Sequence, residues 1–133
     1  MDQDTLVVET IDAGEKLVAA LIASGFDVLA AGWIKEDEGG QWYLYIVSPL
    51  VDAPGPTAAY RKLNPIYKDL VDKGPLPIDL FDIKLVSPND AIGKALVEFA
   101  PKHAGPLISG YRRPYLGGVP IQEARLYPLV PQA

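Results

Sequence analysis

Two adjacent arginines, Arg112 and Arg113, are the side chains of this sequence whose types and spacing most suggest chemistry. They lie in GYRRPYLGG at 110–118, between Tyr111 and Tyr115. A guanidinium group donates parallel hydrogen bonds to a carboxylate or a phosphate, and it also stacks on aromatic rings. The proline and glycines of the same segment are typical of a tight turn. The segment therefore predicts either an anion-binding turn or the closed end of a hairpin.

The tripeptide Val-Ser-Pro occurs twice, at 47–49 and at 86–88, and marks a second place for chemistry. Each copy ends an expected strand and is followed by an aspartate, Asp52 or Asp90, and by an expected helix. Serine caps a helix start and proline suits the first helical position, so ordinary turn chemistry explains both copies. A second interpretation is functional, because the free N–H groups of a helix start also bind anions.

These features form one site only if their strands end at the same edge of a sheet. Strand–helix–strand connections within one sheet make the strands parallel, so we expect the strands at 41–49, 78–86 and 107–113 to end side by side. Ligands favour the crevice outside such carboxyl ends. An antiparallel third strand would instead place the arginines at the far end of the molecule. The ligand-binding residues of this hypothesis are Ser87, Asn89, Tyr111, Arg112, Arg113 and Tyr115, with Ser48, Asp52 and Asp90 at the same edge.

A helix is expected first, followed by a hairpin of two strands. Asp12 and Glu15 have the spacing of a capping box, apolar residues follow at helical spacing, and Gly25 suits the position just after the last turn. The strands at 28–36 and 41–49 are joined by the polar, glycine-bearing turn DEGG.

We expect this hairpin to pair Glu36 with Gln41. In that register both faces of the hairpin are largely apolar, which indicates that both faces are covered. The cover could be helices, the C-terminal segment or a second subunit, and the sequence leaves these alternatives open.

A second helix follows the segment PGPT at 54–57 and ends before Gly74. Pro65 interrupts its apolar stripe, and proline lacks the donor for an interior hydrogen bond. We therefore expect a kink or a restart at Pro65, with Asn64 as the cap.

The strand at 78–86 leads into a third helix, which Ser87 caps and Pro88 begins. The tail from 107 to 128 predicts two short strands around the turn PYLGG. Strand alternation places three apolar residues of the 78–86 strand on one side, namely Phe81, Ile83 and Leu85.

Composition excludes several classes of site. The 133 residues include no cysteine and one histidine, His103, so disulfides, cysteine nucleophiles and structural zinc within one chain are ruled out. No phosphate-binding loop, dinucleotide fingerprint, nucleophile elbow or zinc-protease motif is present. The sequence therefore favours a non-catalytic protein, and we identify no catalytic residue, metal site or cofactor.

The charge distribution bears on partners and location. The net charge of −5 argues against a general nucleic-acid binder, although residues 57–133 carry ten bases and seven acids. The N-terminus is acidic, whereas a secretory signal opens with basic residues. The apolar run at 17–23 is too short to span a bilayer. We therefore expect a cytoplasmic protein without membrane contact.

Together these patterns predict a single α+β domain over residues 1–133, in the order α-β-β-α-β-α-β-β. The domain should contain a mixed sheet of about five strands and three helices. The leading functional hypothesis is a binding or assembly module, either homo-oligomeric or bound to a protein partner, because apolar surface exceeds what three modest helices cover. The alternatives are a small-ligand or phosphate-binding protein that uses helix starts with Arg112 and Arg113, and a nucleic-acid accessory protein.

Overall fold

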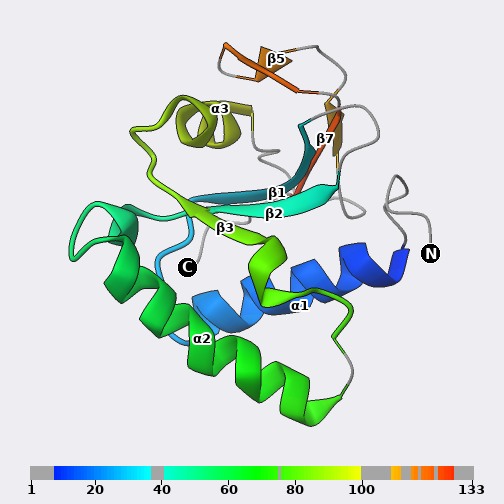
Figure 1. Ribbon diagram of the computed structural model, residues 1–133, viewed down its shortest axis with the longest axis vertical. Coiled ribbons are helices and arrows are strands. Elements are labelled where there is room, and N and C mark those ends of the chain that lie inside the picture. The colour runs from blue at the N-terminus through cyan, green and yellow to red at the C-terminus, as the bar shows by residue number, and fades with distance from the viewer. Residues whose placement is uncertain are drawn as a thin grey trace.

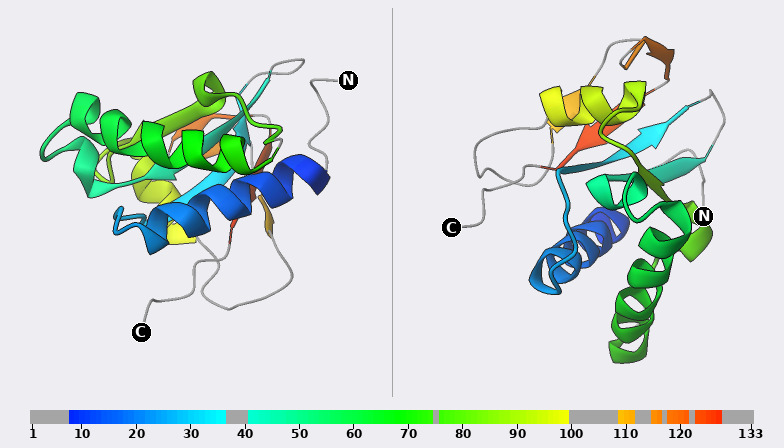
Figure 2. Two further views of the ribbon diagram at one scale, coloured as in Figure 1. Left: turned by 90° about the horizontal axis from the view of Figure 1, so that it is seen from below. Right: turned by 90° about the vertical axis from the view of Figure 1, so that its left-hand side faces the viewer.

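A computed structural model describes residues 8–36, 41–74, 76–99, 109–111, 115–116, 118–121 and 123–127. These residues form a sheet between two layers of helix (Figure 1). Two helices, α1 (Val8–Ala23) and α2 (Pro56–Lys73), cover one face of the sheet, and α3 (Ala91–Phe99) covers the other (Figure 2, right). The short hairpin of β5 (Tyr115–Leu116) and β6 (Val119–Pro120) lies on the side of α3.

The central sheet is mixed and has the strand order β3-β2-β1-β7-β4. Strands β2 and β3 are parallel, and all other neighbours in this sheet are antiparallel. The predicted α+β class, the three helices and the sheet of five strands are confirmed, with the β5–β6 hairpin as an addition between the last two strands of the sheet. The five strands are β1 (Ala30–Lys35), β2 (Trp42–Val47), β3 (Ile83–Val86), β4 (Ser109–Tyr111) and β7 (Glu123–Leu126).

The register of the β1–β2 hairpin is the predicted one. Lys35 lies opposite Trp42 and Ala30 opposite Val47, so Glu36 and Gln41 flank the turn as expected. The face toward α1 and α2 carries Ala31, Trp33, Trp42, Leu44 and Ile46, and the face toward α3 carries Ala30, Ile34, Tyr45 and Val47.

Both apolar faces of the hairpin are therefore buried by the chain's own elements. Leu44 and Ile46 are fully buried on one face, and Ile34 and Val47 are fully buried on the other. The expected cover is confirmed, and it needs no second subunit. The apolar hairpin consequently gives no argument for assembly, contrary to the reasoning from the sequence.

The α1 helix differs from the prediction at its start and agrees at its end. The helix already includes Val8, so Asp12 and Glu15 lie inside it and the expected capping box is wrong. Gly25 is confirmed as the residue after the last turn, with a φ of 84° that favours glycine. Its N–H donates to the Ile22 carbonyl at 3.1 Å, and the Phe26 N–H reaches back to Leu21 at 2.9 Å.

The α2 helix continues through Pro65, so the expected restart at that residue is wrong. Tertiary packing explains the continuity. Leu63 is fully buried just before the proline, and Ile66 and Tyr67 pack on the same core just after it. Because burial of one helical face contributes more than local propensity, the helix tolerates the missing hydrogen bond.

Strand β3 is shorter than expected, and this changes the position of Phe81. Residues Leu80–Asp82 form a 3-10 turn, η2, in which the Asp79 carboxylate accepts a hydrogen bond from the Phe81 N–H at 3.0 Å. Ile83 and Leu85 are buried as predicted, but the Phe81 side chain is 87% exposed. The local cap has ended the strand pairing before Phe81 could face the core.

Candidate functional site

The carboxyl ends of the first two of these strands, β2 and β3, lie side by side, as the sequence predicted. Val47 and Val86 are register partners, so the two Val-Ser-Pro segments lie side by side at the carboxyl ends of β2 and β3. The Ser48 N–H extends the pairing to the Val86 carbonyl at 3.0 Å. Ser48 and Ser87 are both buried.

The polar groups at this edge bind one another. The Asp52 carboxylate accepts hydrogen bonds from the Ser87 hydroxyl at 2.8 Å and from the Asn89 side-chain amide at 3.0 Å. The Ser87 oxygen accepts from the Asn89 N–H at 2.9 Å, and the Ser48 oxygen accepts from the Leu50 N–H at 3.2 Å. In the anion hypothesis, by which Ser87 and Asn89 bind a phosphate or carboxylate ligand together with the arginines, these donors were assigned to the ligand. Asp52 instead accepts their hydrogen bonds, and its negative charge disfavours a second anion there.

Helix α3 is held close to the same edge by a glycine. A Cβ placed on Gly93 would lie 1.9 Å from the Ser87 carbonyl oxygen and 3.3 Å from the Pro88 Cα. The first distance is far below van der Waals contact and the second is a tight contact, so the helix reaches this position only without a side chain at 93. The edge is therefore a packed junction between β3 and α3.

The carboxyl end of the third strand, β4, does not lie beside those of β2 and β3, so the expectation that all three strands end at one edge is wrong. β4 is antiparallel to β7, and β7 and β2 are both antiparallel to the strand between them, β1, so β4 runs opposite to β2 and β3. Tyr111 pairs with Ala124, which lies level with Tyr43 at the start of β2. This position is about 13 Å along the sheet from Val47, at 3.3 Å per residue.

The physical reason is a long-range pairing. The chain returns from α3 to the side of β7, at the far side of the sheet from β3, and not to a place beside β3. Of the predicted ligand-binding residues, Ser87 and Asn89 lie together at the strand exits, and Tyr111 in β4 does not join them. Tyr115 lies in the separate β5–β6 hairpin. Arg112, Arg113 and also His103 lie outside the described residues.

A cationic and aromatic cluster lies on the α3 face of the sheet. The Lys84 ammonium is 4.2 Å from the centre of the Tyr43 ring and 3.5 Å from a carboxylate oxygen of Glu36. The Tyr45 hydroxyl hydrogen-bonds to the same carboxylate. These charges and rings satisfy one another, which matches a structural role in closing the end of the sheet.

A buried tyrosine that the sequence analysis missed joins the last strand to the first helix. The Tyr127 hydroxyl accepts a hydrogen bond from the Trp33 indole N–H at 2.8 Å and donates one to the Ile11 carbonyl at 2.5 Å. Burial raises the pKa of Tyr127 well above its ordinary value, and the charges of Glu15 and Asp12 act in the same direction. The phenol is therefore a neutral structural donor rather than a reactive group.

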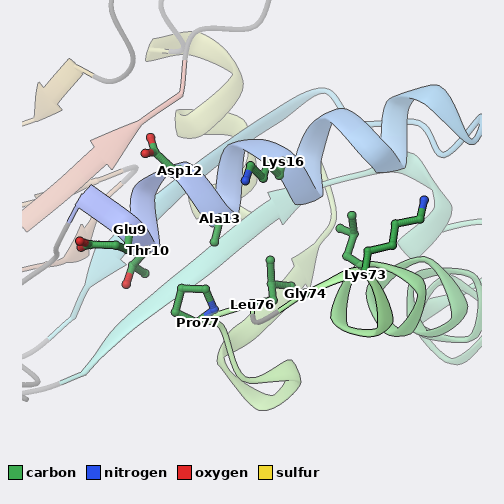
Figure 3. A pocket seen from close by; sticks show the side chains of 10 residues that line it. Glu9, Thr10, Asp12, Ala13, Lys16, Lys73, Gly74, Leu76 and Pro77 are labelled. Atoms are coloured by element: carbon green, nitrogen blue, oxygen red, sulfur yellow. The ribbon is translucent and has the colours of Figure 1, made fainter.

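An open groove separates the first half of α1 from the chain that leaves α2 (Figure 3). Its volume is about 690 Å³, which falls within the range of about 300–1,000 Å³ typical of ligand sites. Figure 3 shows Glu9 and Thr10 at one end and Lys73 at the other, with Ala13 and Leu76 pointing into the space between them. The lining residues are Glu9, Thr10, Asp12, Ala13, Lys16, Leu70, Lys73, Gly74, Leu76 and Pro77.

The sequence gives little signal for this groove. One wall comes from residues 9–16 of α1, and the other from Leu70, Lys73, Gly74, Leu76 and Pro77. More than fifty residues separate the two walls in the sequence, and neither wall carries a known motif. The one indication is Gly74, which is typical of the residue just after the end of a helix.

Within the described ranges, no group of three or more acidic or histidine side chains is arranged to hold a metal ion. Among the described residues, no helix has both the length and the apolar character that crossing a bilayer requires. A scan against models of protein families, a search of curated proteins and a search of solved structures each found no match.

Proposed function

We propose that this protein is a non-catalytic binding module that holds its ligand in the groove that α1 forms with Gly74, Leu76 and Pro77. The supporting observation is the groove itself, which has the size of a ligand site, an apolar floor and charged residues on its rim. Ala13, Leu70 and Leu76 supply apolar contact, whereas Glu9 and Lys73 supply charges for orientation.

The state of the other polar clusters supports a role in binding rather than catalysis. At the strand exits, the Asp52 carboxylate bonds to Ser87 and Asn89. In the core, the Tyr127 hydroxyl is used by Trp33 and by the Ile11 carbonyl. Asp52 links the segment after β2 to the start of α3, and Tyr127 links the end of β7 to α1, so both clusters have a structural role in holding the fold together.

The test is to fill the groove and to measure ligand binding. A Cβ on Gly74 meets nothing within 4 Å, so Gly74→Trp should fold and place an indole ring in the groove. Small organic fragments titrated into the ¹⁵N-labelled protein should shift the amide signals of residues 9–16 and 70–77, and Gly74→Trp should abolish those shifts. Lys68→Trp is the matched control, since Lys68 is exposed on α2 and does not line the groove. Fragment shifts that survive in Gly74→Trp would refute the proposal.

A second candidate, assembly with another copy or a protein partner, is favoured by Phe81. An aromatic side chain that is 87% exposed on a capped turn is pre-ordered for contact, which lowers the entropy cost of burying it. Light scattering with size-exclusion chromatography tests self-association, and Phe81→Ser should convert any dimer to monomer. A monomeric wild-type protein at high micromolar concentration would remove the homo-oligomeric form of this proposal.

The anion hypothesis remains a prediction for Arg112 and Arg113. Among the described residues, the negative charge of Asp52 opposes it at Ser87 and Asn89. A cytoplasmic location likewise remains a proposal, which rests on the acidic N-terminal segment and on the short length of the apolar run at 17–23.

A further inference from the structure

The charges of the groove are separated by sign along its length. Glu9, Asp12 and Lys16 recur at intervals of three and four on α1, so they lie along one side of that helix. Lys73 stands on the opposite wall, toward the end that is remote from Glu9 (Figure 3). The groove therefore has an acidic end at Glu9 and a basic end at Lys73, with Lys16 on the α1 wall between them, while the Asp12 carboxylate points away from Leu76 and Pro77 (Figure 3).

The distance between the two ends sets the length of a ligand. Lys16 lies seven positions after Glu9, which corresponds to about 10 Å along a helix at 1.5 Å per residue. An extended peptide spans at most about 3.3–3.6 Å per residue, so about three residues cover this distance. The apolar residues between the ends, Ala13 and Leu76, would face the middle of such a peptide.

The basic end has a charge that a ligand can recruit. The Lys73 ammonium lies 3.1 Å from the Asp69 carboxylate, but these side chains are 72% and 64% exposed. An ion pair that is this exposed contributes little to stability. A ligand carboxylate can therefore share or replace Asp69 as the partner of Lys73 at small cost.

We propose that the groove binds a short peptide of about three residues through its two free termini. The ammonium group lies toward Glu9, the carboxylate lies toward Lys16 and Lys73, and an apolar central side chain packs against Ala13 and Leu76. This inference rests on the proposed binding function and adds the class and orientation of the ligand. Charges of both signs argue for a dipolar ligand, since a simple anion or cation would meet repulsion at one end of the groove.

The experiment uses the peptide Ala-Leu-Ala and three blocked forms of it, with the full chain labelled with ¹⁵N. The free peptide should shift the amide signals of residues 9–16 and 70–77. Acetylation of the amino end removes the positive charge, and amidation of the carboxyl end removes the negative charge. Each single block should weaken binding by up to about fivefold, which is the value of one exposed ion pair, and the doubly blocked peptide should bind weakest.

Charge reversal of the protein tests the orientation. Lys73→Glu should weaken binding of free Ala-Leu-Ala and should have a much smaller effect on the amidated form, which has no carboxylate to repel. Lys68→Glu is the matched control, because it makes the same change in net charge on the exposed surface of α2 outside the groove. High salt should reduce the difference between the peptides, since these charges are exposed to solvent.

The outcomes separate the two proposals. Equal binding of the free and doubly blocked peptides in the groove would overturn the peptide-terminus inference and leave the binding function in place. The same conclusion follows if fragments bind in the groove and no form of Ala-Leu-Ala does. If neither fragments nor peptides shift the signals of the groove residues, both proposals are refuted.

Discussion

Replacing Tyr127 with phenylalanine removes one oxygen from the contact between the last strand and α1. The hydroxyl is the acceptor for the Trp33 indole N–H at 2.8 Å, and Trp33 is 2% exposed. Without it the indole N–H is buried without a partner, whereas the Ile11 carbonyl loses only one of its possible donors. The perturbation therefore creates an orphaned donor in the core.

The expected cost follows from the desolvation of that donor. A buried polar group without a partner costs about 1–3 kcal/mol, so we expect the free energy of unfolding to fall by about 2 kcal/mol. The unfolding entropy of a domain of this size, at about 2.1 cal/mol/K per residue, converts this loss into a fall in Tm of about 7 °C. Urea unfolding followed by fluorescence and a thermal scan measure both quantities.

A double-mutant cycle separates the hydrogen bond from packing. Trp33→Phe removes the donor, so the variant with both changes has no orphaned group. We expect the double variant to be about 1–2 kcal/mol more stable than the sum of the single effects implies. Tyr43→Phe, at a partly buried tyrosine, is the control and should change stability by less than about 0.5 kcal/mol. A Tyr127→Phe protein as stable as the wild type would refute the role assigned to this contact.

Three further results are expected. Gly93→Ala should destabilise the protein by about 1–3 kcal/mol, despite the better helix propensity of alanine, because its Cβ would meet the Ser87 carbonyl; a stability gain in urea unfolding would contradict the close packing of α3. Asp52→Ala should cost about 1 kcal/mol because Ser87 and Asn89 lose their acceptor, and phosphate or sulfate should not raise the Tm of the wild type; a clear Tm gain with either anion would support the anion hypothesis instead. Since burial raises the pKa of Tyr127, the unfolded chain releases this proton first, so the stabilisation is complete below about pH 10 and is lost as pH rises further; Tyr127→Phe should reduce that alkaline loss in unfolding titrations.

Local patterns predicted the parts of the fold that depend on neighbouring residues. The β1–β2 register follows from a short turn and from matching apolar faces, and Gly25 follows from the need for a positive φ after α1. The meeting of Ser48 and Ser87 follows from the strand–helix–strand connection.

Long-range pairing and packing decided the features that the sequence did not predict. The direction of β4 depends on β7, which is more than ten residues later in the chain, and no local signal distinguishes that pairing from one beside β3. The burial of Leu63 stabilises α2 as a helix that continues through Pro65. Phe81 is exposed because the cap formed by Asp79 places it in a turn before β3 begins.

The candidate site shows the same division. Ser87, Asn89 and Asp52 were placed at one edge correctly, yet Asp52 accepts hydrogen bonds from the other two side chains, where the hypothesis had expected a ligand. The groove could not be predicted, because its walls come from α1 and from the end of α2 and neither wall carries a motif.

The most direct measurement of the central claim is a titration of the ¹⁵N-labelled full chain with Ala-Leu-Ala, read residue by residue. We expect saturable shifts at Glu9, Ala13, Lys73 and Leu76 that disappear in Gly74→Trp and persist in Lys68→Trp. Shifts confined to the strand exits around Ser87, or a spectrum unchanged by this peptide and by organic fragments, would contradict this claim.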